Sequence, residues 1–395
     1  MASRASAIQL ADGERVVRAG FLGLILYSVG HFIIDLYSAA LGTLQPVLDA
    51  KLHLDLTHAG ILGGLLVFSA SVMQPAYGYL SDRFHTRLFA GLAPAVAGIF
   101  ISLLGSASSF RWLMALVLLG GCGVASFHPQ ASARATHGMK GNRGRWMAIF
   151  ISAGTLGLAA GPVYFSSVLD KLGLDRLYWA ALPGVIIAAI MLALLPEHVR
   201  PEAHRRHRFD WTPLRAVWKP LTILYFLVFI RSVIQVVFGQ FLPLYLSRER
   251  GFTFTAAAYS LTLYLAAGAI GGFLGGHLAD RYGGRRVIIV SMAACLPFSA
   301  LFFLTSGPIS LLGLALTGLI LLFTIPVNVV MAQELVPAQS GTVSALMMGF
   351  AWGMAGLIFI PLTGWAGDHF TLHRALGALN LFPIVGVFLA LKLPK

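Results

Sequence analysis

The sequence has few charged residues and almost no cysteine. Only 11% of its 395 residues are Asp, Glu, Lys or Arg, and 57% are hydrophobic. An average soluble chain carries about a quarter charged residues, so this composition excludes a soluble globular protein. The two cysteines, Cys122 and Cys295, both lie in apolar runs. Two cysteines are too few for a disulfide framework or a cysteine metal cluster.

The sequence also lacks the motifs of an enzyme. It shows no nucleophile with a matching base, no metal-binding motif and no phosphate loop in a suitable context. His198, His204 and His207 lie close together, but no cysteine or carboxylate spacing completes a ligand set around them. We therefore expect no enzymatic activity, no bound cofactor and no metal.

Long apolar runs fill most of the chain, whose mean hydropathy is +0.80. A run of 18 or more such residues can cross a hydrocarbon core of about 30 Å as a helix. The sequence therefore predicts an all-α polytopic membrane protein. The twelve expected transmembrane helices are 19–44, 58–80, 88–105, 111–133, 146–169, 177–196, 220–247, 254–279, 287–306, 309–333, 341–367 and 375–391.

The net charge of +13 is distributed unevenly between the two sides of these helices. With the N-terminus in the cytoplasm, 20 of the 28 Lys and Arg fall in cytoplasmic segments, 7 in external loops and one inside a helix. This is the bias of the positive-inside rule, and it predicts that both termini are cytoplasmic. The basic charge therefore orients the chain in the lipid bilayer, and we expect no nucleic-acid partner.

A repeat divides the chain into two similar halves. Residues 78–83 read GYLSDR and residues 276–281 read GHLADR, an offset of 198. The glycine-proline pattern of 154–162 recurs 199 residues later, at 353–361. Such a repeat predicts two pseudo-symmetric six-helix bundles. We expect an N-terminal bundle over 1–196, a basic cytoplasmic linker over 197–218 and a C-terminal bundle over 219–395.

These features together resemble the major facilitator superfamily. A narrower set of motifs, in the same order along the chain, is similar to the fosmidomycin resistance protein family: HFIID at 31–35, QPAYG at 74–78, SFHP at 126–129, AQEL at 332–335 and GFAWGM at 349–354. The resemblance implies a monomeric proton-coupled antiporter of the bacterial inner membrane. It would export the phosphonate antibiotic fosmidomycin by alternating access, with the proton gradient as driving force. The family often has Glu where this chain has Gln130.

Ionisable residues in the middle of transmembrane helices are costly, so they mark candidate pathways. His31 and Asp35 are four residues apart and share one helix face. Such a pair can take up and release a proton near neutral pH, which makes Asp35 the candidate proton carrier and His31 its partner. Glu334, near the end of its helix, is a third candidate for proton coupling.

Arg231 is the candidate anion-binding residue. It stays charged, and its planar guanidinium suits phosphonate, phosphate or carboxylate. Unpaired in lipid it would be very costly, so its partner is either an acid such as Asp35 or an anionic substrate. Further polar contacts to the substrate are expected from His128, Gln130, Gln235 and Asn328.

The two repeated motifs are expected to control the conformational equilibrium. A charged network between the halves at the cytoplasmic ends would stabilise the outward-facing state and break on inward opening. The gate residues are Gly78, Asp82, Arg83, Arg87, Gly276, Asp280, Arg281 and Arg285.

Two other functions remain open at this point. The protein could carry another small anion, a sugar phosphate or a siderophore, in either direction, because Arg231 fits any of these. It could also be a membrane sensor that transports nothing, and substrate flux would separate the two.

Overall fold

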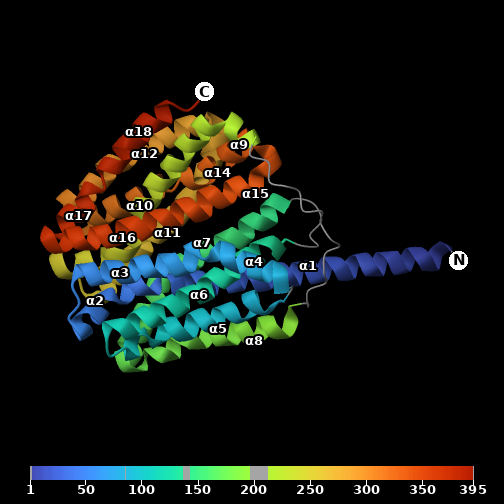
Figure 1. Cartoon of the computed structure of the whole chain (residues 1–395), viewed down its shortest axis with the longest axis horizontal. Coiled ribbons are helices and arrows are strands. Elements are labelled where there is room, and N and C mark those ends of the chain that lie inside the picture. The colour runs from blue at the N-terminus through green and yellow to red at the C-terminus, as the bar shows by residue number, and fades with distance from the viewer. Residues whose placement is uncertain (1, 85, 137–142, 196–211, 395) are drawn as a thin grey trace.

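The computed structural model describes residues 2–84, 86–136, 143–195 and 212–394, and Figure 1 shows its arrangement. Within these ranges every regular element is a helix. Twelve stretches are long and apolar enough to cross a membrane, six before residue 196 and six after residue 211. Helices predominate because a backbone in lipid must satisfy its hydrogen bonds within its own segment. Each of the twelve predicted spans is confirmed, with ends that differ by at most three residues except in the first, which continues to Leu52 instead of residue 44.

The first six spans are built from eight α-helices and three shorter helical turns. The 3₁₀ and π turns, labelled η, continue or join the α-helices at bends within a span. The elements are α1 (Ala2–Ser38), α2 (Ala40–Leu52), α3 (Leu56–Val67), η1 (Phe68–Val72), α4 (Gln74–Phe84), α5 (Leu88–Ser102), η2 (Leu103–Ser106), α6 (Phe110–Arg134), α7 (Arg143–Leu172), η3 (Leu174–Ala181) and α8 (Leu182–Leu194).

The second half has the same plan. Most of the predicted linker, 197–218, lies outside the described ranges, which resume at Thr212 with a single helical turn. The elements are α9 (Thr212–Ala216), α10 (Trp218–Glu249), α11 (Phe254–Tyr282), α12 (Gly284–Leu304), α13 (Gly307–Leu321), α14 (Thr324–Leu335), η4 (Pro337–Gln339), α15 (Ser340–Ser344), η5 (Ala345–Phe350), α16 (Ala351–His369), α17 (Leu372–Ala378) and α18 (Leu381–Leu391).

Each half buries its own apolar core. One cluster of buried side chains spans residues 24–195 and the other spans 221–393. Leu56, Ala59 and Ala159 of the first half join the second cluster, so the halves also pack on each other. That packing pairs α3 with α16, α7 with α11 and α2 with α10.

Glycines allow these helices to approach closely. A Cβ added at Gly60 of α3 would lie 2.9 Å from the carbonyl oxygen of Ile360 in α16. In α11 the glycines in close contact are Gly268, Gly271 and Gly275, whereas a Cβ added at Gly272 or Gly276 would have no neighbour closer than 3.8 Å. The reason is that 3.6 residues per turn rotates every fourth residue off a contact line.

Two ends of the bundle are named below by their elements. The linker end is the end at which α8 stops and α10 starts, to the right in Figure 1. The opposite end is the end at which α10 and α16 stop and α3 starts, to the left in Figure 1. At the opposite end, hydrogen bonds and an ion pair join the two halves, as described below.

Candidate functional site

Three polar side chains meet inside the first half. The Nε2 atom of His31 lies 3.4 Å from Oδ2 of Asp35, one turn further along α1. The Nε2 atom of His128, on α6, lies 3.6 Å from the other carboxylate oxygen, Oδ1. We call these residues the His–Asp–His cluster. The pairing of His31 with Asp35 follows from their spacing, but the approach of His128 depends on how α6 packs against α1.

Phe150 fixes the His31 ring, and Gly154 makes room for it. Its Nδ1 atom lies 2.9 Å from the backbone carbonyl oxygen of Phe150 on α7. A carbonyl oxygen only accepts, so Nδ1 carries the hydrogen and the neutral ring presents a lone pair at Nε2. The Phe150 ring stacks on the imidazole at 4.4 Å between centroids. Gly154 provides the remaining room, because a Cβ there would lie 2.5 Å from His31 Cε1 and 2.6 Å from Asp35 Oδ2.

Arg231 lies in the second half, on α10, and is only 5% exposed. Its Nη1 donates to Oε1 of Gln235 at 2.6 Å, and its guanidinium carbon lies 5.6 Å from the centre of the Trp352 ring on α16. No carboxylate lies within ion-pair distance of it among the described residues. Its Nε also has no hydrogen-bond acceptor there. Two partners were expected for Arg231, an acid such as Asp35 or an anionic substrate. Asp35 is not its partner in this conformation.

Gln130 does not join either group, which corrects its expected role in substrate contact. Its Oε1 accepts from the Ala90 backbone N–H at 2.9 Å, and its Nε2 donates to Ser81 Oγ at 2.7 Å and to the Thr86 carbonyl at 2.6 Å. Ser81 lies near the end of α4, Thr86 in the α4–α5 connection and Ala90 in the first turn of α5. The amide therefore holds this corner against α6, and its oxygen and both of its N–H groups are already engaged there.

Glu334 and Asn328 both lie on α14, away from the cluster. Glu334 is exposed near the end of its helix, so its surroundings do not distinguish it from a solvated carboxylate. Asn328 is fully buried, and neither its Oδ1 nor its Nδ2 has a partner in the described part of the chain. A role in proton coupling for Glu334 and in substrate contact for Asn328 stays a prediction.

The repeated arginines bond within their own halves. Arg87, before α5, donates to the carbonyl oxygen of Leu195 after α8 at 2.5 Å. Arg285 in α12 donates to the carbonyl oxygen of Leu391, the last residue of α18, at 2.6 Å. Each arginine thus satisfies an end carbonyl of the sixth span of its half, where a positive charge is favoured. Neither arginine therefore bonds across the halves in this conformation, and their role in a network between halves stays a prediction.

The other gate positions repeat in the same way. A Cβ added at Gly78 would lie 3.5 Å from Pro129, and one added at Gly276 would lie 3.8 Å from Pro326. The guanidinium of Arg83 lies 5.8 Å from the Phe84 ring and that of Arg281 lies 5.3 Å from the Tyr282 ring. Asp280 forms no ion pair within the described ranges, and the side chain of Asp82 lies outside them. Their role as a conformational gate stays a prediction.

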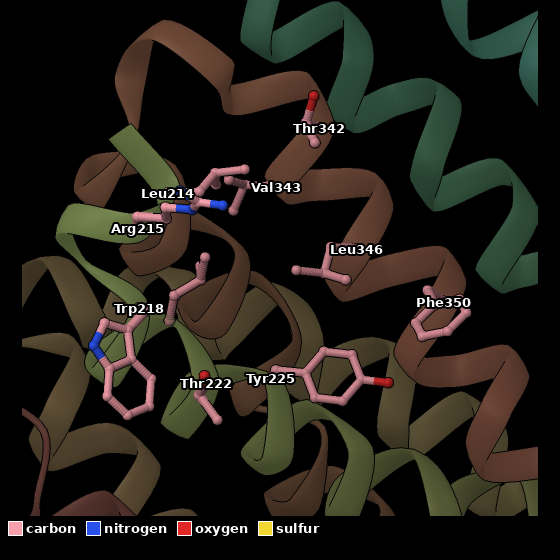
Figure 2. A pocket seen from close by; sticks show the side chains of 10 residues that line it. Leu214, Arg215, Trp218, Thr222, Tyr225, Thr342, Val343, Leu346 and Phe350 are labelled. Atoms are coloured by element: carbon pink, nitrogen blue, oxygen red, sulfur yellow. The ribbon is translucent and has the colours of Figure 1, made fainter. Parts of the chain in front are cut away.

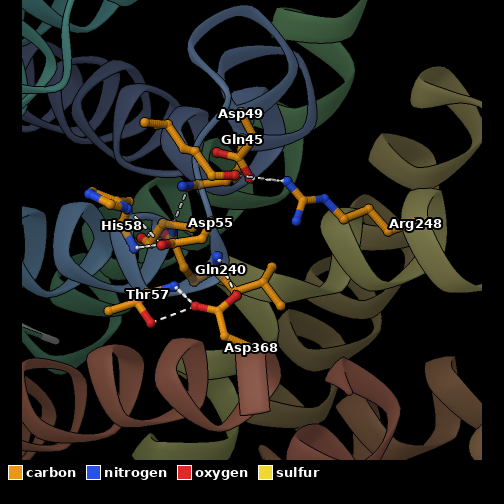
Figure 3. A network of polar contacts seen from close by, with 11 residues as sticks. Gln45, Asp49, Asp55, Thr57, His58, Gln240, Arg248 and Asp368 are labelled. Carbon is orange, nitrogen blue, oxygen red and sulfur yellow. Dashed lines mark hydrogen bonds and ion pairs between the residues drawn. The ribbon is translucent and has the colours of Figure 1, made fainter. Parts of the chain in front are cut away.

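Sequence reasoning missed a pair of carboxylates that join the halves at the opposite end. Asp368 at the end of α16 accepts from the Leu56 and Thr57 backbone N–H groups of α3 at 2.9 and 2.7 Å, and from the Thr57 hydroxyl at 2.5 Å (Figure 3). Asp170 in α7 accepts from the Thr255 hydroxyl of α11 at 2.9 Å. We call these two contacts the carboxylate lock. Asp170 and Asp368 are 198 residues apart, and so are Thr57 and Thr255. This offset is that of the repeat, so the sequence could have indicated the two contacts.

Between the two contacts of the lock, α2 and α10 cross closely. Arg248 donates to Oδ2 of Asp49, a 1% exposed residue, at 3.0 Å, and Gln240 donates to Gln45 (Figure 3). Because these contacts link the halves beside the lock, the opposite end is closed in this structure.

Asp55 completes the capping of α3. Its carboxylate accepts from the His58 backbone N–H at 2.7 Å and contacts the His58 ring at 2.6 Å. Slight burial raises the pKa of the Asp55 carboxyl, but the hydrogen bonds from His58 outweigh it and hold the pKa below its usual range. Two carboxylates, one from each half, thus satisfy the first N–H groups of this helix.

A cavity of about 570 Å³ lies at the linker end, between the start of α10 and the α15–η5 segment. Figure 2 shows Tyr225 and Phe350 extending into it, and Leu214, Trp218 and Leu346 lie around it. Tyr225 precedes Arg231 by six residues on α10, about 9 Å along the helix. The linker end therefore has open space on the same helix that carries the buried arginine.

Comparison with known proteins decides the family. Residues 27–360 match the model of the Major Facilitator Superfamily. The chain belongs to this superfamily. With twelve membrane spans in two six-helix bundles, it is a multi-pass membrane protein of a transporter family.

Two curated relatives extend over nearly the whole chain. An uncharacterised transporter of this superfamily, YfnC of Bacillus subtilis, is 32% identical over 384 residues, 94% of this chain and 92% of its own. The fosmidomycin resistance protein of Escherichia coli is 27% identical over 377 residues, 93% of this chain and 91% of its own.

Solved structures share the fold at lower identity. A bacterial homologue of the human lysosomal transporter Spinster, inward-facing and unoccupied, has a TM-score of 0.80 at 16% identity, over 94% of this chain and 96% of that one. A point mutant of the nucleoside transporter NupG has a TM-score of 0.77 at 16% identity, over 95% of this chain and 100% of that one. These likenesses concern the fold of this superfamily member.

Proposed function

We propose that this protein is a proton-coupled exporter of a small phosphonate-type anion that works by alternating access. The observation that carries the proposal is the buried, carboxylate-free environment of Arg231 described above. A guanidinium in a membrane interior costs a great deal of free energy unless it meets an anion. In a transporter, a substrate oxyanion is the partner that such a residue suits.

The substrate class is supported by two independent features. The Escherichia coli relative is a fosmidomycin resistance protein, and the similarity covers both halves of the chain. Trp352 forms one wall beside the guanidinium, and Gln235 holds it in place, so a small oxyanion can approach from the remaining directions. Phosphonate, phosphate and carboxylate groups all have the geometry that a guanidinium binds.

Proton coupling is assigned to Asp35. Its carboxylate lies between two imidazoles in the first half, while the anion site lies in the second. The two sites are on different bundles, so movement of the bundles can link their occupancies. With a negative cell interior, an anion leaving and a proton entering both move with the potential, worth about 2.3 kcal/mol per charge per 100 mV.

Orientation follows if the linker end is cytoplasmic. The positive-inside bias supports cytoplasmic termini. The bacterial relatives favour a bacterial inner membrane. The carboxylate lock then closes the external side, and the structure represents the inward-facing state of a monomer. Bundles over 1–196 and 219–395 would rock about the central site, with 197–218 as the connection between them.

The test uses purified protein in proteoliposomes that contain a pH-sensitive dye. Addition of fosmidomycin is expected to move protons in the wild type and to fail in Asp35→Asn and Arg231→Gln. Asp175→Asn and Arg374→Gln change the same charges at exposed positions and should retain the signal. Loss of signal in the controls would show that charge alone, and not the site, was being measured.

The same assay separates the alternatives. A response to another small anion, a sugar phosphate or a siderophore, with none to fosmidomycin, would keep the mechanism and reject this substrate. Silence with all of them, in protein whose folding is verified by thermal unfolding, would reject transport and favour a sensor.

A further inference from the structure

We propose that His31, Asp35 and His128 form a binding site for a divalent transition-metal ion of the Zn²⁺ type. The inference concerns the cluster itself and stands whether or not the protein exports phosphonates. The sequence alone predicted no metal, because no cysteine or carboxylate spacing completes a ligand set around the three linker histidines, and His128 lies 93 residues from Asp35 along the chain.

The spacing of the donor atoms is the first support. One ligand atom from each of the three residues lies within 4.8 Å of both others. The two measured N–O separations, 3.4 and 3.6 Å, are longer than a hydrogen bond of 2.7–3.2 Å. Zn²⁺ binds nitrogen and oxygen at about 2.0–2.2 Å, and tetrahedral ligands at that radius lie about 3.3–3.6 Å apart. Both separations fall in this range, with the carboxylate of Asp35 turning one oxygen to each imidazole.

The orientation of His31 is the second support. Its Nδ1–H donates to the Phe150 carbonyl, so the lone pair of Nε2 points toward Asp35. Metal-binding histidines almost always donate their other ring N–H to a carbonyl, a carboxylate or water, because this fixes the tautomer and raises basicity. The Phe150 ring, stacked on the imidazole, prevents rotation of the ligand.

Access and room favour an ion as well. The side chains of His31, Asp35 and His128 are 11%, 19% and 23% exposed, so the group is enclosed but reachable. His31 and Asp35 pack directly against Gly154, where any larger residue would displace them. Three protein ligands leave at least one coordination position free, which an external ligand can fill.

The donor set selects the class of metal. Two imidazoles and one carboxylate suit Zn²⁺, Co²⁺, Ni²⁺ or Fe²⁺. Ca²⁺ and Mg²⁺ prefer oxygen ligands in larger number, and this cluster offers two carboxylate oxygens. The expected order is therefore tight binding of Zn²⁺ and no measurable binding of Mg²⁺.

The experiment is calorimetric titration of the purified full chain with Zn²⁺ after treatment with a chelator. The protein is isolated with a tag that contains no histidine. One Zn²⁺ per chain is expected, with an affinity that falls at least about tenfold in both His128→Ala and Asp35→Asn. His58→Ala is the matched control, because His58 also contacts a carboxylate, that of Asp55, but at an exposed site. Its titration should match the wild type.

A second measurement on the wild type avoids the question of whether variants fold. X-ray absorption of the Zn²⁺ complex should show two imidazole nitrogens and at least one oxygen in the first coordination sphere. Titrations unchanged in His128→Ala and Asp35→Asn, or a spectrum with fewer than two imidazoles, would overturn the proposal. Because both measurements are made without substrate or a proton gradient, their failure would leave the proposed transport function untouched, and the reverse also holds.

Discussion

Asp368→Asn is the change that most directly tests how the halves are held together. Asp368 belongs to α16, yet its two oxygens accept three hydrogen bonds from Leu56 and Thr57 at the start of α3. Asparagine is nearly the same size but has a single acceptor oxygen. If that oxygen turns to the two Thr57 donors, the amide nitrogen faces the Leu56 N–H, so that hydrogen bond is lost and the other two lose their charged acceptor.

The effect can be worked out from these bonds. At an exposed position a lost bond is worth about 1 kcal/mol, and loss of the acceptor's charge in the other two costs about as much again, so the closed opposite end loses about 2 kcal/mol relative to the open state. That is about a 30-fold shift in the equilibrium, since about 1.4 kcal/mol is tenfold. If about 1% of wild-type molecules are open at this end, about a quarter of the variant molecules should be.

Spin labels at exposed Ala50 and Arg374, in a Cys122→Ser and Cys295→Ala background, allow the distance between the halves to be measured by double electron–electron resonance. We expect a second, longer distance in Asp368→Asn. The matched control is Asp170→Asn, in which one acceptor oxygen still suffices for the single bond from the Thr255 hydroxyl. A distance distribution for Asp368→Asn identical to the wild type would refute the role of the lock.

Three further predictions concern the two sites and the cap of α3. Gly154→Ala places a Cβ 2.5 Å from Cε1 of His31 in the His–Asp–His cluster, so the free energy of unfolding should fall by about 1–3 kcal/mol and proton-coupled flux should be lost. The matched control is Gly23→Ala, because a Cβ there would have nothing within 4 Å. Thermal unfolding and the dye assay should show the control unchanged. Arg231→Lys loses the planar two-point donor, so the anion concentration for half-maximal flux should rise by about tenfold or more while the protein stays folded. The lowered pKa of Asp55 means that its carboxylate stabilises the fold above its unfolded pKa of about 4 and loses this effect as pH falls. Asp55→Asn should therefore unfold at a lower temperature than the wild type at pH 7, and the difference should shrink below about pH 4, as circular dichroism can show.

The contacts of Arg87 and Arg285 differ in kind from those of the lock. Each of these arginines holds the sixth span of its own half, so each bundle is stabilised as a unit. The lock holds one bundle to the other through hydrogen bonds at their edges. Two rigid bundles joined by a few hydrogen bonds can move relative to each other between two states.

The sequence by itself determined the membrane spans and the two-fold plan. Apolar runs of sufficient length must become helices, because lipid offers no partner for an open backbone. The 198-residue offset placed the repeated motifs in equivalent positions of the two halves. The i, i+4 spacing brought His31 and Asp35 together, since helical geometry alone sets that distance.

Tertiary structure alone decided which distant residues meet. His128 joins Asp35 from 93 positions along the chain, and Asp368 reaches Thr57 from 311 positions. The rotation of each helix about its axis decided the partners of two further residues. It turned Gln130 toward α4 and α5, and it left Arg231 without an acid among the described residues. That rotation is set by close packing at glycines and by the fit of whole helix faces, which no local pattern of residues specifies.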